Sequence, residues 1–195
     1  EIYEKKAPYT FVSEEVCKEA RTAFDKGIEC ILNTQIKKDG KLMVWCAQHD
    51  EVTLLPAKAR AYELPSFSGS ESYGIVKLLM SLPNPSQRII DAIEGAVAWF
   101  EASRIEGIGY QFFTNEEGKK DYRMVPCPDG EKCRPLWARF YTLEDNRPFF
   151  CGRDGIMKFD VSEIEYERRT GYSWYNGNGE KLQRDYQKWK KKLAK

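Results

Sequence analysis

The apolar residues of four stretches recur every three or four positions, which is the spacing of an amphipathic helix. The predicted helices cover residues 13–33, 68–82, 84–100 and 180–193. Ser13 is a favourable N-cap for the first helix, and the second and third open with capping-box sequences. Because proline cannot continue a helix, Pro83 ends the second one. Most of the regular structure is therefore expected to be helical.

Two other regions lack this spacing. Residues 53–65 are too polar for a buried strand and too apolar for a solvated linker, so we expect an ordered loop packed across a cleft. Between residues 107 and 179, Gly, Pro, Asn and Asp recur every few positions among scattered aromatic residues. We expect ordered coil there, with a short strand-like piece at 110–113 and a brief helix near 162–168.

Composition narrows the function classes. A chain of 195 residues with 42% hydrophobic residues can bury one core, so residues 1–195 are expected to form a single domain. A formal net charge of +1 gives no field that favours nucleic acid or an anionic membrane. No apolar run is long enough to cross a membrane and no export signal opens the sequence, so a secreted or periplasmic chain would have lost its signal before residue 1. The aromatic content of 13% suits surfaces that stack on sugar rings.

Cysteine and histidine usage argues against a metal centre built on them. The chain has six Cys residues and one His, without the spacing of a zinc site, and no metal ligand is identified from the sequence. Cys127 and Cys133 flank a Pro-Asp-Gly turn, so they either form a disulfide or stay as two free thiols. Cys46 and His49 could form a thiol nucleophile, but nothing in the sequence supplies a third partner.

Arginines on coil-like segments remain as candidates for chemistry. The sequence has no nucleotide-binding, P-loop, serine-hydrolase or zincin motif. Arg60, Arg139 and Arg153 each lie among glycine or aromatic residues, where a guanidinium group can bind a planar carboxylate in bidentate fashion. A uronic acid polymer presents one carboxylate per sugar, so converging arginines could bind it. The alternative is structural ion pairing with Asp154, Glu144 or Glu63.

Three motifs give the chain a family resemblance. WCAQHDEVTLLPAKARAYELPSFSGSES, RPLWARFYTLEDNRPFFCGRDG and EIEYERRTGYSW resemble the signatures of the family ten polysaccharide lyases, the pectate lyases. The resemblance implies a mainly α fold, a partial α/α toroid of helical hairpins with one face of extensive irregular coil. It also implies that polygalacturonate, the acidic polymer of pectin, is cleaved by anti β-elimination.

The resemblance assigns roles to particular residues. The arginine of the ARAYE motif is Arg60, implied to be the Brønsted base that removes the C5 proton of galacturonate. Arg139 and Arg153 are implied to bind substrate carboxylates. An arginine base is unusual because its pKa lies above about 12. We expect neighbouring cations such as Lys58 to disfavour the charged guanidinium, and we expect high pH optima.

Other residues of the motifs are weaker candidates. His49 and Tyr172 are assigned to substrate binding with Lys58, although His49, like Trp45 and Gln48, could be a packed wall of the cleft. Arg168, Arg169, Tyr172 and Trp174 could line the cleft or, slightly more in keeping with the pattern, lock the coil onto the helices. Asp50 and Glu51 lack calcium-ligand spacing and are expected to be structural.

The resemblance covers the C-terminal half of a pectate lyase catalytic module. The family binds calcium through aspartates of an N-terminal half that nothing in this chain matches, so calcium is expected as a cofactor with ligands from outside this sequence. One alternative is a truncated, non-catalytic fragment that binds polygalacturonate without cleaving it. Another is a structural helical domain without a ligand.

Overall fold

The computed structural model describes residues 1–193 and divides the chain into two compact units, Glu1–Thr34 and Gln35–Lys195. The prediction of one domain over residues 1–195 stays a prediction. The helices are η1 Tyr9–Phe11, α1 Glu14–Thr34, α2 Gly69–Met80, α3 Gln87–Ala102, η2 Val161–Glu163, α4 Tyr166–Gly171 and α5 Asn178–Leu193. The strands are β1 Lys37–Lys38, β2 Lys41–Leu42, β3 Phe67–Ser68, β4 Ile108–Thr114, β5 Lys120–Pro126, β6 Trp137–Ala138, β7 Phe140–Tyr141, β8 Pro148–Cys151, β9 Met157–Lys158 and β10 Tyr175–Asn176.

The first unit consists of a short lead-in segment and α1. The Ser13 side chain accepts a hydrogen bond from the Val16 backbone N–H at 3.3 Å, which satisfies one of the free donors at the helix start. The Tyr3 ring of the lead-in lies 5.5 Å from the Phe24 ring of α1 and also contacts Arg21. These contacts fold the lead-in back onto its own helix, and the helix predicted at 13–33 is confirmed.

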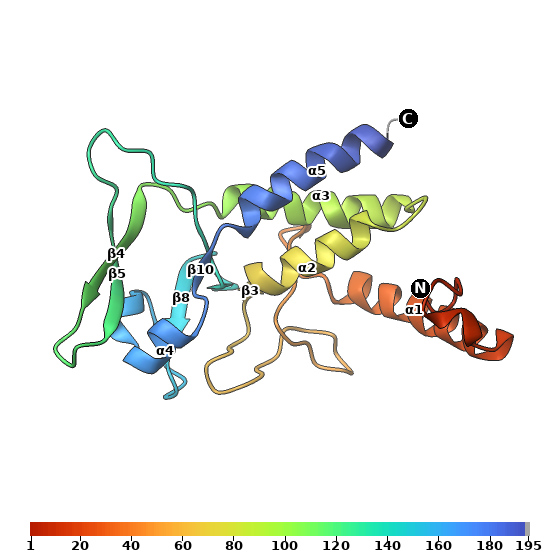
Figure 1. Ribbon diagram of the computed structural model, residues 1–195, viewed down its shortest axis with the longest axis horizontal. Helices are drawn as coiled ribbons and strands as arrows, with labels where there is room; N and C mark the ends of the chain where they lie inside the picture. Colours follow the sequence, from red (N-terminus) through yellow and green to blue (C-terminus); the bar gives the residue numbers. More distant parts are fainter. Residues whose placement is uncertain (194–195) are drawn as a thin grey trace. The chain divides into compact units, whose positions relative to one another are not determined.

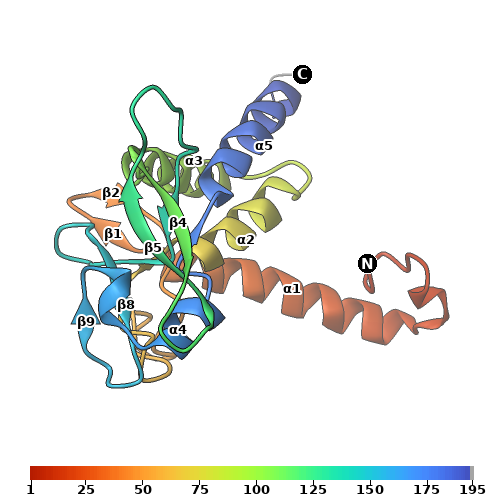
Figure 2. The same ribbon diagram turned by 60° about the vertical axis from the view of Figure 1, so that its left-hand side comes forward.

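The second unit contains the helices α2, α3 and α5, which lie side by side (Figures 1 and 2). The prediction placed the N-cap of α3 two residues too early, at Asn84. Asn84 has a φ of 48°, which is a left-handed backbone conformation, so it belongs to the turn after Pro83. Ser86 is the actual N-cap, and its hydroxyl accepts a hydrogen bond from the Ile89 N–H. The other predicted helices agree with the structure within a few residues.

The prediction of a mainly α, partial α/α toroid with one coil face is wrong. The chain is 40% helix and 19% strand, and the strands form several antiparallel sheets. The largest sheet has the order β3-β7-β8-β9, while β4 pairs with β5 and β10 pairs with β6. Many of these strands are only two to four residues long, too short to show the alternation of polar and apolar residues that identifies a strand. The region expected to be coil therefore contains a mixed α and β structure.

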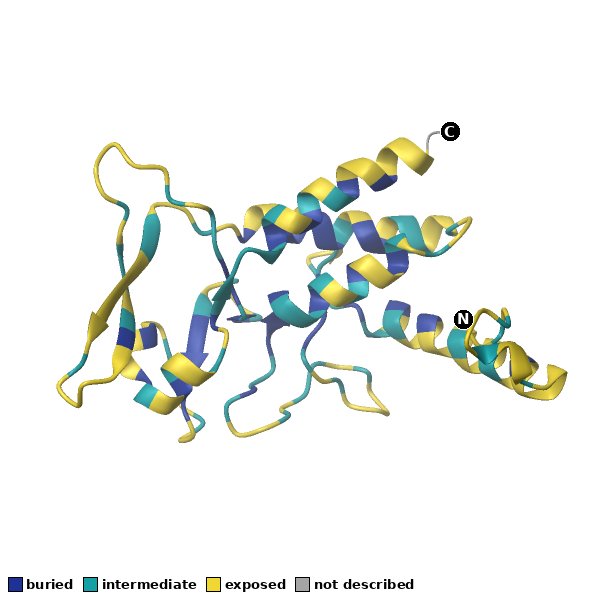
Figure 3. Ribbon diagram, in the orientation of Figure 1, coloured by how far each residue is buried: buried dark blue, intermediate teal, exposed yellow. Residues whose placement is uncertain are grey.

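A cluster of aromatic residues forms the core below the arginine-bearing loops. Phe140, Phe149, Phe150 and Trp174 are at most 1% exposed and pack together with other buried residues of the sheet. Figure 3 shows this burial on β8 and on the inner faces of α2, α3 and α5. Tyr62 and Leu64 of the 53–65 loop pack against the cluster, as does Tyr172. The loop is therefore held in place by apolar burial, which accounts for its mixed composition.

Two further features bear on the sequence predictions. Cys127 and Cys133 form a disulfide with an S–S distance of 2.18 Å, which decides between the two alternatives that the spacing left open. The other four cysteines are free thiols. Within residues 1–193, no helix combines the length and the apolar character that a membrane crossing needs.

Candidate functional site

The turn between Cys46 and Pro56 is held by its own polar side chains. The Cys46 backbone N–H donates a hydrogen bond to Nε2 of His49, and Nδ1 of His49 lies 3.0 Å from the Leu54 carbonyl oxygen. Burial lowers the pKa of His49, which favours the neutral ring that these bonds require. Asp50 likewise accepts hydrogen bonds from the Thr53 side chain and backbone. His49, assigned to substrate binding from the sequence, is thus placed as a brace of the turn.

Arg60 lies at the exposed end of the next turn and forms an ion pair with Glu63. Its Nε donates a hydrogen bond to Oε2 of Glu63 at 2.8 Å, and Nη2 contacts Oε1. The Arg60 side chain is 61% exposed, whereas that of Glu63 is 9% exposed. The hydrogen bonds with Glu63 raise the pKa of Arg60 above its ordinary value, and those with Arg60 lower the pKa of Glu63 to about 2. The structure therefore pairs Arg60 with an anion, which stabilises the charged guanidinium.

We expect Glu63→Gln to remove part of the stability that the protein has near neutral pH. A carboxyl group whose pKa falls from 4.5 to about 2 on folding contributes stability above pH 4.5 and loses it as the pH falls towards 2. The variant should therefore be less stable near pH 7 by roughly 1–2 kcal/mol, after allowance for the exposed partner, with little difference near pH 2. Urea denaturation between pH 2 and pH 7 measures this.

Glu167→Gln is the matched control for this experiment. Glu167 pairs with Arg153 as Glu63 pairs with Arg60, but here both members of the ion pair are exposed. Its replacement should change the free energy of unfolding only slightly at any pH. Equal losses in the two variants would show that the burial of Glu63 has no effect on its contribution.

Two tyrosines join the Arg60 turn to the rest of the site. The Tyr62 and Tyr172 rings meet edge to face with their centroids 5.7 Å apart. The Tyr172 hydroxyl donates a hydrogen bond to Oε1 of Glu63 at 2.9 Å, and burial raises the pKa of Tyr172 to about 12, so the hydroxyl keeps its proton at neutral pH. The Arg60 guanidinium lies 4.9 Å from the Tyr62 ring. Tyr172, a substrate-binding candidate from the sequence, is thus in direct contact with the partner of Arg60.

Arg139, between β6 and β7, reaches Tyr172 of this pair. Its backbone N–H donates to the Trp174 carbonyl at 2.7 Å and its carbonyl accepts from the Gly69 N–H at 2.9 Å, so its position is set by both neighbouring segments. Its guanidinium lies 4.4 Å from the Tyr172 ring and pairs with Glu71 through Nη2. Nε of Arg139 is buried and has no hydrogen-bond partner among the described residues.

Arg168 on α4 completes the group; from the sequence it was named only together with Arg169, Tyr172 and Trp174, with a structural role slightly favoured. Its side chain is stacked between the two tyrosines, 3.6 Å from the Tyr62 ring and 4.5 Å from the Tyr172 ring. The residue is 7% exposed, yet Nε and Nη2 have no hydrogen-bond partner among residues 1–193. No carboxylate of the described chain pairs with it, in contrast to Arg60 and Arg139. Burying a guanidinium group without a hydrogen-bond acceptor costs free energy. Arg168 is therefore the clearest candidate for a residue that binds an anion.

The contrast between Arg168 and its neighbour explains why the sequence could not separate them. Arg169 donates to both carboxylate oxygens of Asp121 and to the Ile164 carbonyl, so it anchors α4 to β5. The two arginines are adjacent in the motif, and only the folded chain shows that one is fully paired and the other is not. A signal in the sequence was the presence of Tyr62 and Tyr172 in the same motifs as Arg60 and Arg168, because arginine stacks readily on aromatic rings.

Arg153 and Lys58 lie on two loops that touch. A Cβ atom at Gly155, which has a φ of +72°, would lie 3.2 Å from the Ala61 carbonyl oxygen and 3.9 Å from Nζ of Lys58. The loop that carries Arg153 therefore runs directly beside the loop that carries Lys58 and Arg60. The Arg153 side chain is 62% exposed and pairs with Glu167 of α4, next in sequence to Arg168. Both residues stand at the margin of the tyrosine and arginine group.

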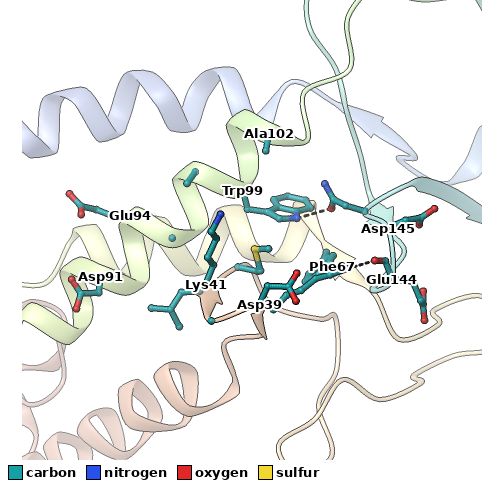
Figure 4. A pocket seen from close by; sticks show the side chains of 16 residues that line it. Asp39, Lys41, Phe67, Asp91, Glu94, Trp99, Ala102, Glu144 and Asp145 are labelled. Atoms are coloured by element: carbon teal, nitrogen blue, oxygen red, sulfur yellow. Dashed lines mark hydrogen bonds between the residues drawn. The ribbon is translucent and has the colours of Figure 1, made fainter.

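A pocket of about 770 Å³ lies elsewhere in the second unit (Figure 4). It contains Trp99, whose indole N–H donates to the Asn146 side chain at 2.8 Å, and none of the residues proposed from the sequence lines it. Its charged lining residues are mostly acidic: Asp39, Asp91, Glu94, Glu144 and Asp145, against Lys38 and Lys41. A polyanion would be repelled by this excess of carboxylates, so the arginine group is the better receptor.

Comparison with known families decides the affiliation of the chain. The family described as pectic acid lyase matches residues 1–183. The chain belongs to the pectic acid lyase family. No curated protein sequence gave a significant match. The resemblance inferred from the three sequence motifs is thereby confirmed.

Two solved structures of this kind are similar to the chain. One is the family 10 polysaccharide lyase from Cellvibrio cellulosa, with 39% identity and a TM-score of 0.80. The other is a mutant of that enzyme in complex with trigalacturonic acid, with 38% identity and the same TM-score. The match covers 95% of this chain but only 56% of the first solved chain and 57% of the second. This pectic acid lyase family member thus spans little more than half the length of these relatives.

Proposed function

We propose that this chain carries the arginine part of a pectate lyase active site and acts on polygalacturonate by anti β-elimination. The observation that carries the proposal is the unpaired, buried guanidinium of Arg168, which shares the rings of Tyr62 and Tyr172 with Arg60 and Arg139. A galacturonate carboxylate can accept hydrogen bonds from such a group. Support for this substrate also comes from the similar lyase that was solved with trigalacturonic acid.

In this proposal the arginines have different tasks. Arg168 and Arg139 bind the carboxylate of the sugar whose C5 proton is lost, and Arg153 with Lys58 binds a neighbouring sugar at the margin of the site. Neutralising the carboxylate acidifies the C5 proton, because negative charge accumulates on the carboxylate as that proton leaves. Arg60 accepts the proton, the electrons of the C5–H bond form the double bond between C4 and C5, and the bond from C4 to the leaving oxygen breaks. The leaving oxygen takes a proton from water, and the new chain end is an unsaturated sugar.

Arg60 can act as a base only after its guanidinium has lost a proton. Glu63 opposes this loss, whereas the nearby positive charge of Arg168 favours it. If a substrate carboxylate displaced Arg60 from Glu63, the rings of Tyr62 and Tyr172 would stay in place. The reaction should therefore be faster at alkaline pH, where a larger fraction of Arg60 is neutral.

The described residues do not fit a calcium site. Within residues 1–193, no group of three or more His, Cys, Asp or Glu side chains could hold a metal ion. We therefore assign no step of the reaction to calcium. The family resemblance implies calcium as a cofactor, and we propose that its ligands belong to the portion of the longer relatives that this chain does not cover. The proposed substrate, pectin, further implies a secreted or periplasmic location.

A second function, binding without cleavage, is favoured by the same ion pair. Arg60 is paired with Glu63, and no metal-binding group is present among the described residues, so the chain could retain polygalacturonate without turning it over. In this alternative Arg139, Arg153 and Arg168 keep their carboxylate-binding tasks.

One experiment separates the two functions. The chain is incubated with polygalacturonate at alkaline pH, and the ultraviolet absorbance of the unsaturated product is followed with added calcium and with a chelator. Electrophoresis in gels that contain polygalacturonate measures binding. Rising absorbance that the chelator abolishes supports a calcium-dependent lyase, and retardation without absorbance supports the binding fragment. The absence of both would overturn the proposal.

A further inference from the structure

The β4–β5 hairpin presents an aromatic face that the reaction does not use. Within the described residues the hairpin pairs with no other strand, and its register places Phe112 opposite Tyr122 and Tyr110 opposite Met124. Residues two apart on a strand share a face, so Tyr110, Phe112 and Tyr122 lie on the same side. Phe112 is 75% exposed, and its ring is stacked on that of Tyr110 with a centroid distance of 5.6 Å and an angle of 9°.

This aromatic face is rigidly held. The Tyr110 hydroxyl donates to the Tyr175 carbonyl at 3.3 Å, and the Tyr122 hydroxyl donates to the Arg169 carbonyl at 3.1 Å. The Tyr110 ring also meets the Tyr122 and Tyr175 rings edge to face. The tyrosines are therefore fixed to α4 and to the segment that follows it, and the exposed Phe112 ring rests on a support that does not need to reorganise when a ligand binds.

A pocket of about 340 Å³ lies between this face and the segment after α4. Its lining includes Tyr110, Phe112, Lys120 and Tyr172. Asp121 and Arg169, which also line it, neutralise each other in an ion pair, whereas Lys120 forms no ion pair within residues 1–193. The pocket therefore combines flat aromatic surface with one uncompensated positive charge.

Tyr172 connects this pocket with the arginine group. Its ring lines the pocket and also contacts the guanidinium groups of Arg139 and Arg168. A polymer chain that places one carboxylate at these arginines would have its next sugars beside Tyr172 and the hairpin. Sugar rings present C–H faces that pack on aromatic rings, and each uronate also carries an anion that Lys120 can pair with.

We propose that the aromatic face of the hairpin is a distal sugar-binding subsite for the uronate polymer, with Phe112 as the stacking platform and Lys120 as the carboxylate partner. The inference rests on the proposed function. It predicts that the chain binds long oligogalacturonates more tightly than short ones, because only the long ones reach from the arginines to the hairpin.

The test compares Phe112→Ala with Phe113→Ala in the full chain. Phe113 is the next residue on β4 and is 42% exposed, but it points to the opposite face of the hairpin and contacts Arg123. Titration calorimetry gives the Kd of each variant for trigalacturonate and for octagalacturonate. Phe112→Ala should weaken octagalacturonate binding about tenfold and leave trigalacturonate binding within about twofold. Phe113→Ala should change neither, and Lys120→Ala should weaken octagalacturonate binding with a reduced salt dependence.

Each outcome decides between the subsite and the proposed function. The subsite would be overturned if Phe112→Ala and Phe113→Ala weakened binding equally, or if Phe112→Ala weakened binding of the short and the long ligand equally. Neither result would contradict the proposed arginine site. Wild-type binding that does not depend on ligand length would do the same. If the wild-type chain bound neither ligand, the proposed function itself would fail, and the subsite with it. Both phenylalanines are exposed, so the variants should keep the wild-type circular dichroism spectrum.

Discussion

Replacement of Arg60 by alanine is expected to lower kcat on polygalacturonate by about 10²–10⁴-fold, the usual contribution of a general base. KM should change little, because in the proposal the substrate carboxylate is held by Arg168, which contacts both tyrosines, and by Arg139, which contacts Tyr172. The rate of the wild-type protein should rise with pH as neutral arginine becomes more abundant, and the variant should lose this dependence. Initial rates of unsaturated product formation across the alkaline range measure both effects.

Arg21→Ala is the matched control for Arg60→Ala. Arg21 is 59% exposed, pairs with Asp25 at 2.9 Å and lies 5.0 Å from the Tyr3 ring, so its surroundings closely resemble those of Arg60. Its removal should leave kcat and the pH profile unchanged. A loss of less than about tenfold for Arg60→Ala, or a similar loss for both variants, would show that Arg60 is not the base.

The variant Glu63→Gln tests the same mechanism independently. The carboxylate raises the pKa of Arg60, so its removal in Glu63→Gln should lower that pKa. The alkaline limb of the rate profile should then move to lower pH, even though the variant is less stable. A limb that stays where it is would indicate that another group titrates.

Replacement of Arg168 by methionine is expected to weaken trigalacturonate binding by about 10²-fold without lowering stability. The lost affinity corresponds to charge-assisted hydrogen bonds, which contribute roughly 1.5–3 kcal/mol each. Stability should be unchanged or higher by up to about 2 kcal/mol, because methionine removes a buried cation that lacks a hydrogen-bond partner. The lost stacking on Tyr62 reduces this gain. Calorimetric titration and urea denaturation measure the two effects.

Arg169→Met should give the reverse result. Its removal leaves the carboxylate of Asp121, which is 3% exposed, without its partner, so we expect destabilisation of about 3–5 kcal/mol. Binding of trigalacturonate by the folded fraction should change little, because Arg169 is directed to Asp121 and to backbone carbonyl groups. If Arg168→Met were destabilising and Arg169→Met weakened binding, the assignment of the two arginines would have to be exchanged.

Strong local patterns predicted the helices well and the strands poorly. The apolar spacing of residues 13–33 and 84–100 extends over several turns, so it predicts a helix whatever the tertiary contacts are. The hairpin at 108–126 was reduced in the prediction to a piece at 110–113, because Gly109 and the charged residues of β5 hide the alternation. The two-residue strands β3, β6 and β7 pair with segments far away in the sequence, which no local pattern can show.

The roles assigned to the site residues stay predictions, and the structure shows only where these residues lie. Arg60, Arg139 and Tyr172 do meet around the tyrosine pair, while the ring nitrogens of His49 are both used within its own turn. The predicted influence of Lys58 on Arg60 left out Glu63, whose hydrogen bonds shift the pKa of Arg60 in the opposite direction. Arg168 was grouped with Arg169 because burial and hydrogen bonding, which distinguish them, are properties of the folded chain.

The sequence by itself determined the family, the helices and the use of arginine as the main polar chemistry, because these depend on residue type and short-range spacing. Only the tertiary structure decided which of the arginines Arg60, Arg139, Arg168 and Arg169 are already paired with a carboxylate. That distinction depends on Glu63, Glu71 and Asp121, each brought to its arginine by a different turn, helix or strand. The free energy of a buried charge is set by its nearest neighbours in space, and the chain order does not specify them.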